Sequence, residues 1–132
     1  MRKVSKKKTI LVVEDSETSY CLINEILAGS GVNLRRVMNG EDAVRQCAQN
    51  KDLDLVIMDI VLPGIDGINA TKEIKLKRKD LKIIAISALV TDNIKNECIE
   101  AGCDEFIPKP IDIDYFRTMV HDLLEGKVSV ED

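Results

Sequence analysis

Short apolar runs alternate with longer amphipathic stretches along this chain of 132 residues. The apolar runs, at residues 9–13, 34–37, 55–58, 82–87 and 105–107, predict five β-strands. Three of them are nearly continuous in isoleucine, leucine and valine, which is typical of parallel strands covered on both faces.

The stretches between the strands have apolar residues three or four positions apart, which predicts amphipathic helices with one buried face. These helices cover residues 16–27, 41–49, 67–77, 92–101 and 112–125. The first stripe would bury Leu22, Ile23, Ile26 and Leu27, and the last Ile113, Phe116, Val120, Leu123 and Leu124. Suitable N-cap residues, Ser16, Asn39, Thr91 and Asp112, lie near four helix starts. Five alternating units of this kind predict a doubly wound α/β domain.

Composition agrees with one globular domain, because 45% of the residues are hydrophobic and only seven are glycine and three proline. The net charge of −4 argues against nucleic acid as a partner. No apolar run approaches the roughly 18 residues that span a bilayer, so we expect no membrane partner and a cytoplasmic location.

The two ends of the chain are expected to lie outside the domain, which we place at residues 9–125. Residues 1–8 are basic but lack the apolar stretch of a signal peptide. They could be a membrane or nucleic-acid arm, although we favour a solvated leader. Residues 126–132 form a short polar tail.

The four cysteines, Cys21, Cys47, Cys98 and Cys103, contain no C-x-x-C pair, and His121 is the only histidine. Zinc would require a tighter grouping of such ligands. We therefore expect four buried apolar cysteines in a reducing compartment.

One charged residue, Asp59, interrupts an apolar run that extends from residue 55 to residue 63. Burying an unpaired carboxylate is costly, so folding alone does not account for it. A Pro63-Gly64 turn follows, which indicates that Asp59 lies where the strand ends.

Other polar residues follow the remaining predicted strands. Glu14 and Asp15 come after the first, Ser87 ends the fourth, and Lys109 comes after the fifth. Because the carboxyl ends of parallel strands share one edge, these residues should gather around Asp59. Three clustered carboxylates favour a hard divalent cation such as Mg²⁺, and the hydroxyl and ammonium groups suit phosphoryl oxygens.

Four motifs in this order carry a resemblance to a known family. They are Ile10-Leu-Val-Val-Glu14-Asp15, Met58-Asp59-Ile-Val-Leu-Pro63-Gly-Ile-Asp66-Gly67, Ile86-Ser87-Ala88 and Phe106-Ile-Pro108-Lys109-Pro110. Together they resemble the receiver domain of two-component response regulators, over about residues 9–125. The resemblance implies a flavodoxin-like fold, a doubly wound five-stranded parallel sheet in the order 2-1-3-4-5 flanked by five helices.

The resemblance also implies a function in two-component or phosphorelay signalling. Asp59 would accept a phosphoryl group from a phosphohistidine in a Mg²⁺-dependent reaction, after which the domain switches its partner-binding face or passes the group on. Glu14, Asp15, Asp59 and the Val61 carbonyl would hold the metal. Ser87 and Lys109 would contact the phosphoryl group, and Ser87 and Phe106 would switch. The Lys109-Pro110 bond is cis in many relatives.

Partners are likewise implied by the resemblance. A sensor histidine kinase or a histidine phosphotransfer protein would dock on the first helix, with Tyr20, Cys21 and Asn24 as candidate contacts. A downstream protein would dock on the fourth helix, fifth strand and fifth helix. The motifs look most like receivers of hybrid histidine kinases, although the initiating methionine slightly favours an independent protein.

The resemblance implies that Val61 and Leu89 flank the pocket entrance, where receiver side chains influence access of the water that hydrolyses the acyl phosphate. Both are aliphatic and cannot orient water by hydrogen bonding, so we expect slow autodephosphorylation. The resemblance implies no other enzymatic activity. Two alternatives remain, a module that docks independently of phosphorylation and a small metal-dependent phosphatase. The first should have lost an acceptor, lysine or acid residue, and the second needs a general base that His121 does not supply.

Overall fold

The computed structural model describes residues 7–126, so residues 1–6 of the expected leader and 127–132 of the expected tail lie outside the described part. Strands and helices alternate strictly along the chain. The strands are β1 Thr9–Val13, β2 Asn33–Val37, β3 Leu55–Asp59, β4 Lys82–Ser87 and β5 Glu105–Pro108. The helices are α1 Glu17–Leu27, α2 Gly40–Gln49, α3 Gly67–Lys77, α4 Asp92–Ala101 and α5 Ile113–Leu124. All ten predicted elements are confirmed, with ends that differ by one residue at most.

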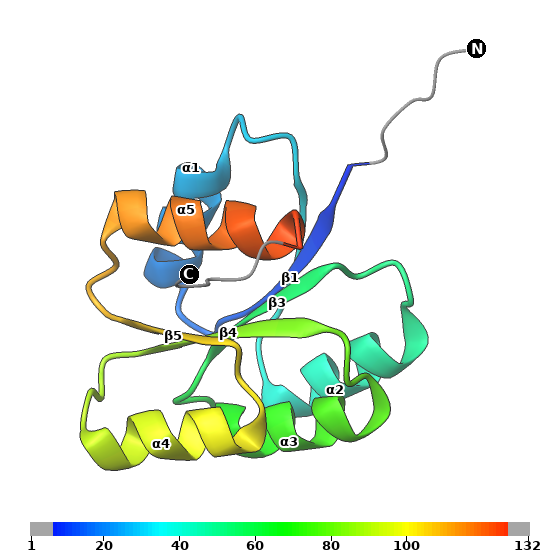
Figure 1. Cartoon of the computed structure of the whole chain (residues 1–132), viewed down its shortest axis with the longest axis vertical. Helices are drawn as coiled ribbons and strands as arrows, with labels where there is room; N and C mark the ends of the chain where they lie inside the picture. Colours follow the sequence, from blue (N-terminus) through cyan, green and yellow to red (C-terminus); the bar gives the residue numbers. More distant parts are fainter. Residues whose placement is uncertain (1–6, 127–132) are drawn as a thin grey trace.

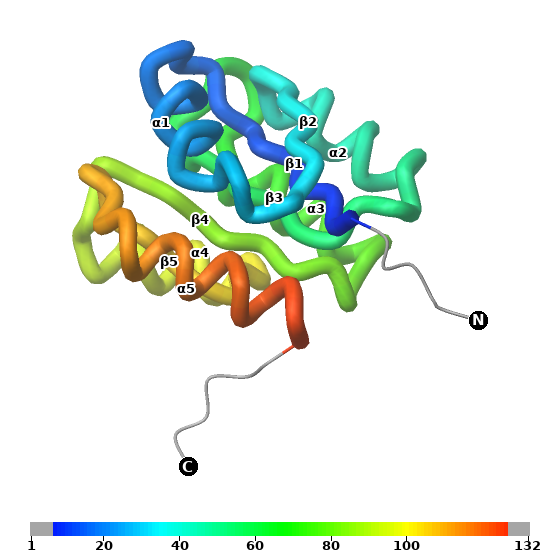
Figure 2. The backbone as a smooth tube through the Cα atoms, turned by 90° about the horizontal axis from the view of Figure 1, so that it is seen from above, coloured from blue at the N-terminus to red at the C-terminus, as the bar shows by residue number. Residues whose placement is uncertain are grey.

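The five strands form one parallel sheet in the order β2-β1-β3-β4-β5. This order confirms the flavodoxin-like fold. The helices cover both faces, with α1 and α5 on one side and α2, α3 and α4 on the other (Figure 1). Viewed from above, α1 and α5 run over the same face of the sheet (Figure 2). Among the described residues, no helix has the length and apolar character needed to cross a membrane.

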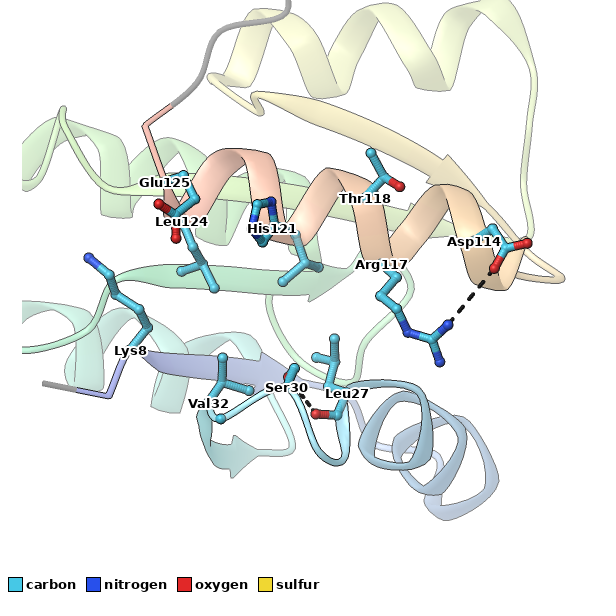
Figure 3. A pocket seen from close by; sticks show the side chains of 12 residues that line it. Lys8, Leu27, Ser30, Val32, Asp114, Arg117, Thr118, His121, Leu124 and Glu125 are labelled. Carbon is cyan, nitrogen blue, oxygen red and sulfur yellow. Dashed lines mark hydrogen bonds and ion pairs between the residues drawn. The ribbon is translucent and has the colours of Figure 1, made fainter. Parts of the chain in front are cut away.

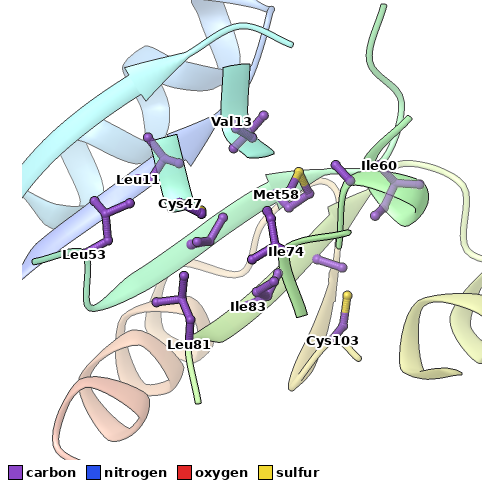
Figure 4. Close-up of a cluster of buried hydrophobic side chains, with 14 of the residues drawn as sticks. Leu11, Val13, Cys47, Leu53, Met58, Ile60, Ile74, Leu81, Ile83 and Cys103 are labelled. Atoms are coloured by element: carbon purple, nitrogen blue, oxygen red, sulfur yellow. The ribbon is translucent and has the colours of Figure 1, made fainter. Parts of the chain in front are cut away.

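Two apolar cores result, one on each face of the sheet, because successive residues of a strand point to opposite sides. On β1, Ile10 and Val12 pack under α1 and α5, whereas Leu11 and Val13 pack under the other three helices. Figure 4 shows part of this second core, in which Ile74 of α3 lies near Met58 of β3 and Ile83 of β4. The nearly continuous apolar strands are thus explained by burial on both faces.

Three expectations about burial are wrong. Cys21 is exposed, although Cys47, Cys98 and Cys103 are buried as expected. Leu22 and Ile113 are 42% and 45% exposed. The core under α1 contacts only a narrow stripe, Ile23, Ile26 and Leu27, so neighbouring positions face solvent, and Ile113 is the first residue of α5.

The helix N-caps were predicted correctly. Ser16, Asn39, Thr91 and Asp112 each accept a hydrogen bond from the backbone N–H three residues ahead. Asp66 caps α3 in the same way. Each cap satisfies an N–H that the helix leaves unpaired, which fixes where the helix begins.

The turn between β3 and α3 brings Gly67 directly under the strand end. Its N–H donates to the carbonyl of Ile60 at 2.9 Å. A Cβ atom at this position would lie 2.3 Å from the carbonyl oxygen of Asp59 and 2.8 Å from the Cα of Ile60. Since both are backbone atoms, the close approach requires glycine and holds the backbone of Asp59 in place.

We expect Gly67→Ala to destabilise the protein by about 1–3 kcal/mol, because the added methyl group has no flexible neighbour to displace. The gain in helix propensity of up to about 1 kcal/mol only partly offsets this strain. Urea unfolding measures the change, with Lys72→Ala on the exposed side of α3 as a control that should stay within about 0.5 kcal/mol. Wild-type stability of Gly67→Ala would contradict the steric argument.

Candidate functional site

The carboxyl ends of four strands bring the predicted site residues to one edge of the sheet. Glu14 follows β1, Asp59 ends β3, Ser87 ends β4 and Lys109 follows β5. Register places Met58 beside Val13 and Asp59 beside Ile86, so the neighbouring strands end at the same level. The predicted gathering of these residues is confirmed.

Carboxylates from two strand ends form a compact oxygen cluster. Carboxylate oxygens of Glu14, Asp15 and Asp59 all lie within 4.8 Å of one another. Glu14 is 1% exposed and Asp59 6% exposed, whereas Asp15 is open to solvent. An all-oxygen set with one open side fits Mg²⁺, which favours carboxylates and retains several waters.

The ammonium group of Lys109 neutralises part of this negative charge. Its Nζ atom lies 3.2 Å from Oδ2 of Asp59 and 3.4 Å from Oε1 of Glu14, and it is also 3.4 Å from the hydroxyl of Ser19. Burial lowers the pKa of Lys109, but the two carboxylates outweigh burial and hold this pKa above its usual value. The lysine therefore remains a cation in the site.

Glu14 is the carboxyl group of the cluster whose pKa is raised. Burial raises the pKa of Glu14 from 4.5 to about 7, together with a hydrogen bond to Asp59 and the negative charge of Asp59. The N–H of Ser16, 3.2 Å from Oε2, and the ammonium of Lys109 act in the opposite direction. Close to neutral pH, Glu14 can thus exchange its proton for a metal ion.

The loop after β3 wraps around the Asp59 carboxylate. The N–H of Val61 donates to Oδ1 of Asp59 at 3.0 Å. The backbone of Val61 is therefore beside the cluster, while its side chain is 57% exposed at the entrance. Leu89, the other aliphatic residue expected at the entrance, is 51% exposed.

Ser87 is fully buried at the end of β4, and its carbonyl accepts a hydrogen bond from the N–H of Lys109 at 2.9 Å. Its hydroxyl oxygen accepts the N–H of Leu89 at 2.9 Å, which leaves the hydroxyl hydrogen to donate elsewhere. Phe106 of β5 lies beside Ala85 of β4. Its side chain is partly buried and packs against the core under α3 and α4. The Lys109-Pro110 peptide bond is cis, as the resemblance implied.

Three residues at the site were missed from the sequence. Ser19 contacts Lys109 from the first turn of α1, and Gly67 supports Asp59 from below. Arg36 of β2 donates from Nε to the backbone carbonyl of Glu14 at 3.1 Å. Gly67 has a signal in the Asp66-Gly67 pair after the turn, whereas nothing local to Ser19 or Arg36 distinguishes them from other polar residues.

A cavity of about 680 Å³ lies away from this edge, between α5 and the end of α1. Leu27, Val32, Arg117, His121 and Leu124 are among the residues that line it (Figure 3). None of the predicted site residues contributes to it. The candidate site is therefore the carboxylate cluster and its lysine.

Two relatives are each 32% identical to this chain over most of its length. One is a cyclic di-GMP phosphodiesterase of Thermotoga maritima, matched over 120 residues that cover 91% of this chain but only 32% of that protein. The other is two-component response regulator 24 of Arabidopsis thaliana, matched over 117 residues that cover 89% of this chain and 84% of the regulator. The chain thus spans about a third of the first relative and most of the second.

A solved receiver domain has a similar fold. The receiver domain of the sensor histidine kinase PA1611 of Pseudomonas aeruginosa superposes with a TM-score of 0.83 and 27% identity, over 91% of this chain and 99% of that one. That domain has a magnesium ion coordinated in its active site cleft. Residues 10–121 of our chain match the response regulator receiver domain, and the chain belongs to this family.

Proposed function

We propose that Asp59 of this receiver domain is the phosphoacceptor and that Mg²⁺ is its cofactor. The observation that supports this most directly is a buried carboxylate at a strand end with the Lys109 ammonium 3.2 Å away and two further carboxylates within 4.8 Å. A carboxylate in this position has a metal site on one side and a cation on the other. Phosphoryl transfer needs little beyond such charge neutralisation and positioning.

The phosphoryl donor is a phosphohistidine of a sensor histidine kinase or a histidine phosphotransfer protein. A carboxylate oxygen of Asp59 attacks phosphorus and forms a P–O bond. The P–N bond of the donor breaks, and its electron pair stays on the imidazole nitrogen, which is then protonated. The product is an aspartyl phosphate on this chain and a free histidine on the partner.

Each neighbouring residue has a role in this proposal. Glu14, Asp15, Asp59 and the Val61 carbonyl would hold Mg²⁺, which supplies charge neutralisation for the phosphoryl oxygens when bound. Lys109 remains cationic and pairs with one phosphoryl oxygen. The Ser87 hydroxyl donates to another, because phosphoryl oxygens only accept hydrogen bonds and the contact with Leu89 does not use the hydroxyl hydrogen.

Phosphorylation would change the partner-binding face through Ser87 and Phe106. Movement of Ser87 toward the phosphoryl group would break its bond to Leu89 and shift the loop before α4. The partly buried Phe106 ring could then move inward without a phenol hydroxyl to satisfy. The downstream protein would bind α4, β5 and α5.

The phosphoryl donor would dock over α1, where Cys21 and Asn24 are exposed and Tyr20 is partly exposed. Residues 9–125 would be the receiver, with residues 1–8 and 126–132 outside it. We further propose a cytoplasmic domain that catalyses only its own phosphorylation and slow dephosphorylation. The alternative of a docking module without phosphorylation is disfavoured because acceptor, lysine and acid pair are all present and close together.

Asp59→Asn should abolish phosphorylation by acetyl phosphate in the presence of Mg²⁺, because the amide cannot attack phosphorus. Intact-mass measurement should show one phosphoryl group on the wild type and none on the variant. Asp52→Asn is the matched control, since Asp52 is exposed and its one ion pair within residues 7–126 is with Arg35. An adduct that persists in Asp59→Asn would place the acceptor elsewhere, and absence of any adduct on the wild type would refute the proposal.

The aspartyl phosphate of the wild type should persist for minutes or longer in the presence of Mg²⁺, because neither Val61 nor Leu89 can orient the attacking water. Leu89→Gln should shorten this lifetime several-fold by supplying a hydrogen-bonding group at the entrance. The measurement follows loss of the phosphoryl group after the donor is removed, with the exposed and remote Leu76→Gln as control. Loss from the wild type within seconds would be incompatible with this account.

Mg²⁺ affinity should rise with pH and level off above about pH 7, because the metal must displace the proton that the raised pKa keeps on Glu14. One displaced proton gives roughly a tenfold gain in affinity per pH unit below that value. Calorimetric titration of the wild type and Glu14→Gln measures the effect. The variant should bind more weakly and with little pH dependence between about pH 5 and 7, and a flat profile in the wild type would contradict the argument.

A further inference from the structure

Arg36 of β2 contacts the turn between β1 and α1 and the first turn of α1. Its Nε atom donates to the backbone carbonyl of Glu14 at 3.1 Å, and Nη1 lies 2.8 Å from the carboxylate of Glu17. The guanidinium group also stacks over the ring of Tyr20, with 4.7 Å between its carbon and the ring centroid. The contacts with Glu17 and Tyr20 hold the guanidinium group in place, and the hydrogen bond to the Glu14 carbonyl holds the turn.

Burial of Arg36 leaves one of its donors without a partner within residues 7–126. The side chain is only 18% exposed, and Nη2 is buried without a hydrogen-bond partner among the described residues. A buried donor that lacks a partner destabilises the folded state. An apolar side chain of similar length would avoid this penalty, but it would also remove the hydrogen bond to the Glu14 carbonyl.

The turn that Arg36 holds carries two of the three clustered carboxylates, those of Glu14 and Asp15. β2 fixes the backbone of Glu14 on both sides, because the N–H of Glu14 donates to the Val37 carbonyl at 3.1 Å and its carbonyl accepts from Arg36. The charge of Arg36 is matched by Glu17 at 2.8 Å. The contact with the turn is therefore chiefly one of geometry.

We propose that Arg36 is a positioning residue for the metal site, which holds the Glu14–Asp15 backbone in the conformation that a divalent cation requires before the cation binds. This inference rests on the proposed Mg²⁺ site. Residues that orient metal ligands without touching the metal typically contribute about 10–100-fold to its affinity. A preformed turn has this effect because less chain entropy is lost on binding.

Arg36→Met tests the inference, with Arg35→Met on the same strand as matched control, because Arg35 is exposed and pairs with Asp52. Calorimetric titration with Mg²⁺ alone should show affinity reduced about tenfold or more in Arg36→Met and unchanged in Arg35→Met. Without metal, amide exchange at residues 14–20 should be faster in Arg36→Met. With acetyl phosphate, the Mg²⁺ concentration for half-maximal rate should rise while the rate at saturating Mg²⁺ stays close to the wild type.

Two conservative variants separate geometry from charge and remain informative if Arg36→Met folds poorly. The amide nitrogen of glutamine occupies the same place along the side chain as Nε of arginine, so Arg36→Gln should retain much of the affinity without the charge. Arg36→Lys retains the charge but has a carbon at that place, and should resemble Arg36→Met.

Rescue by Arg36→Lys but not by Arg36→Gln would overturn the positional role, as would wild-type Mg²⁺ affinity in Arg36→Met. In both cases the wild type still binds the metal, and the proposed function stands. A wild type that binds no Mg²⁺ would overturn the proposed function and this inference together.

Discussion

Repulsion among carboxylates at one edge of a parallel sheet is the constraint around which this receiver domain is organised. Strand order and register bring Glu14 and Asp59 together in a setting from which most water is excluded. Lys109 offsets this repulsion, although it lies 95 residues from Glu14 in the chain. The last strand must therefore pair beside β4, where the N–H of Lys109 bonds to the Ser87 carbonyl and the ammonium reaches across to β1 and β3.

The same constraint links the site to the proposed switch. The cluster has more negative charge than one lysine balances. Burial, followed by the hydrogen bond to Asp59 and the charge of Asp59, raises the pKa of Glu14. A divalent cation and a phosphoryl group would redistribute these charges, with Lys109 and the Ser87 hydroxyl as the groups free to respond. Because the N–H of Leu89 donates a hydrogen bond to the Ser87 hydroxyl, movement of this hydroxyl would shift the loop before α4.

Local patterns were sufficient for the elements and most of the core. Alternation of apolar runs and helical stripes predicted the strands, because the central strands β1, β3 and β4 are buried on both faces and nearly every residue of their sequences is apolar. The helical patterns predicted burial wrongly at the edges of the buried helix faces. Cys21 and Leu22 lie one position from the contact line of α1, and helical periodicity of a short segment does not resolve such a difference.

The sequence by itself determined which residues end the strands, and for a parallel sheet this places Glu14, Asp15, Asp59, Ser87 and Lys109 at one edge. The tertiary structure alone decided how their charges are distributed and what supports them. Hydrogen bonds from Lys109 to the Ser19 hydroxyl and from Arg36 to the Glu14 carbonyl join segments that no sequence period relates. The burial that raises the pKa of Glu14 likewise arises only when the helices close over the sheet, because desolvation is a property of all the surrounding atoms.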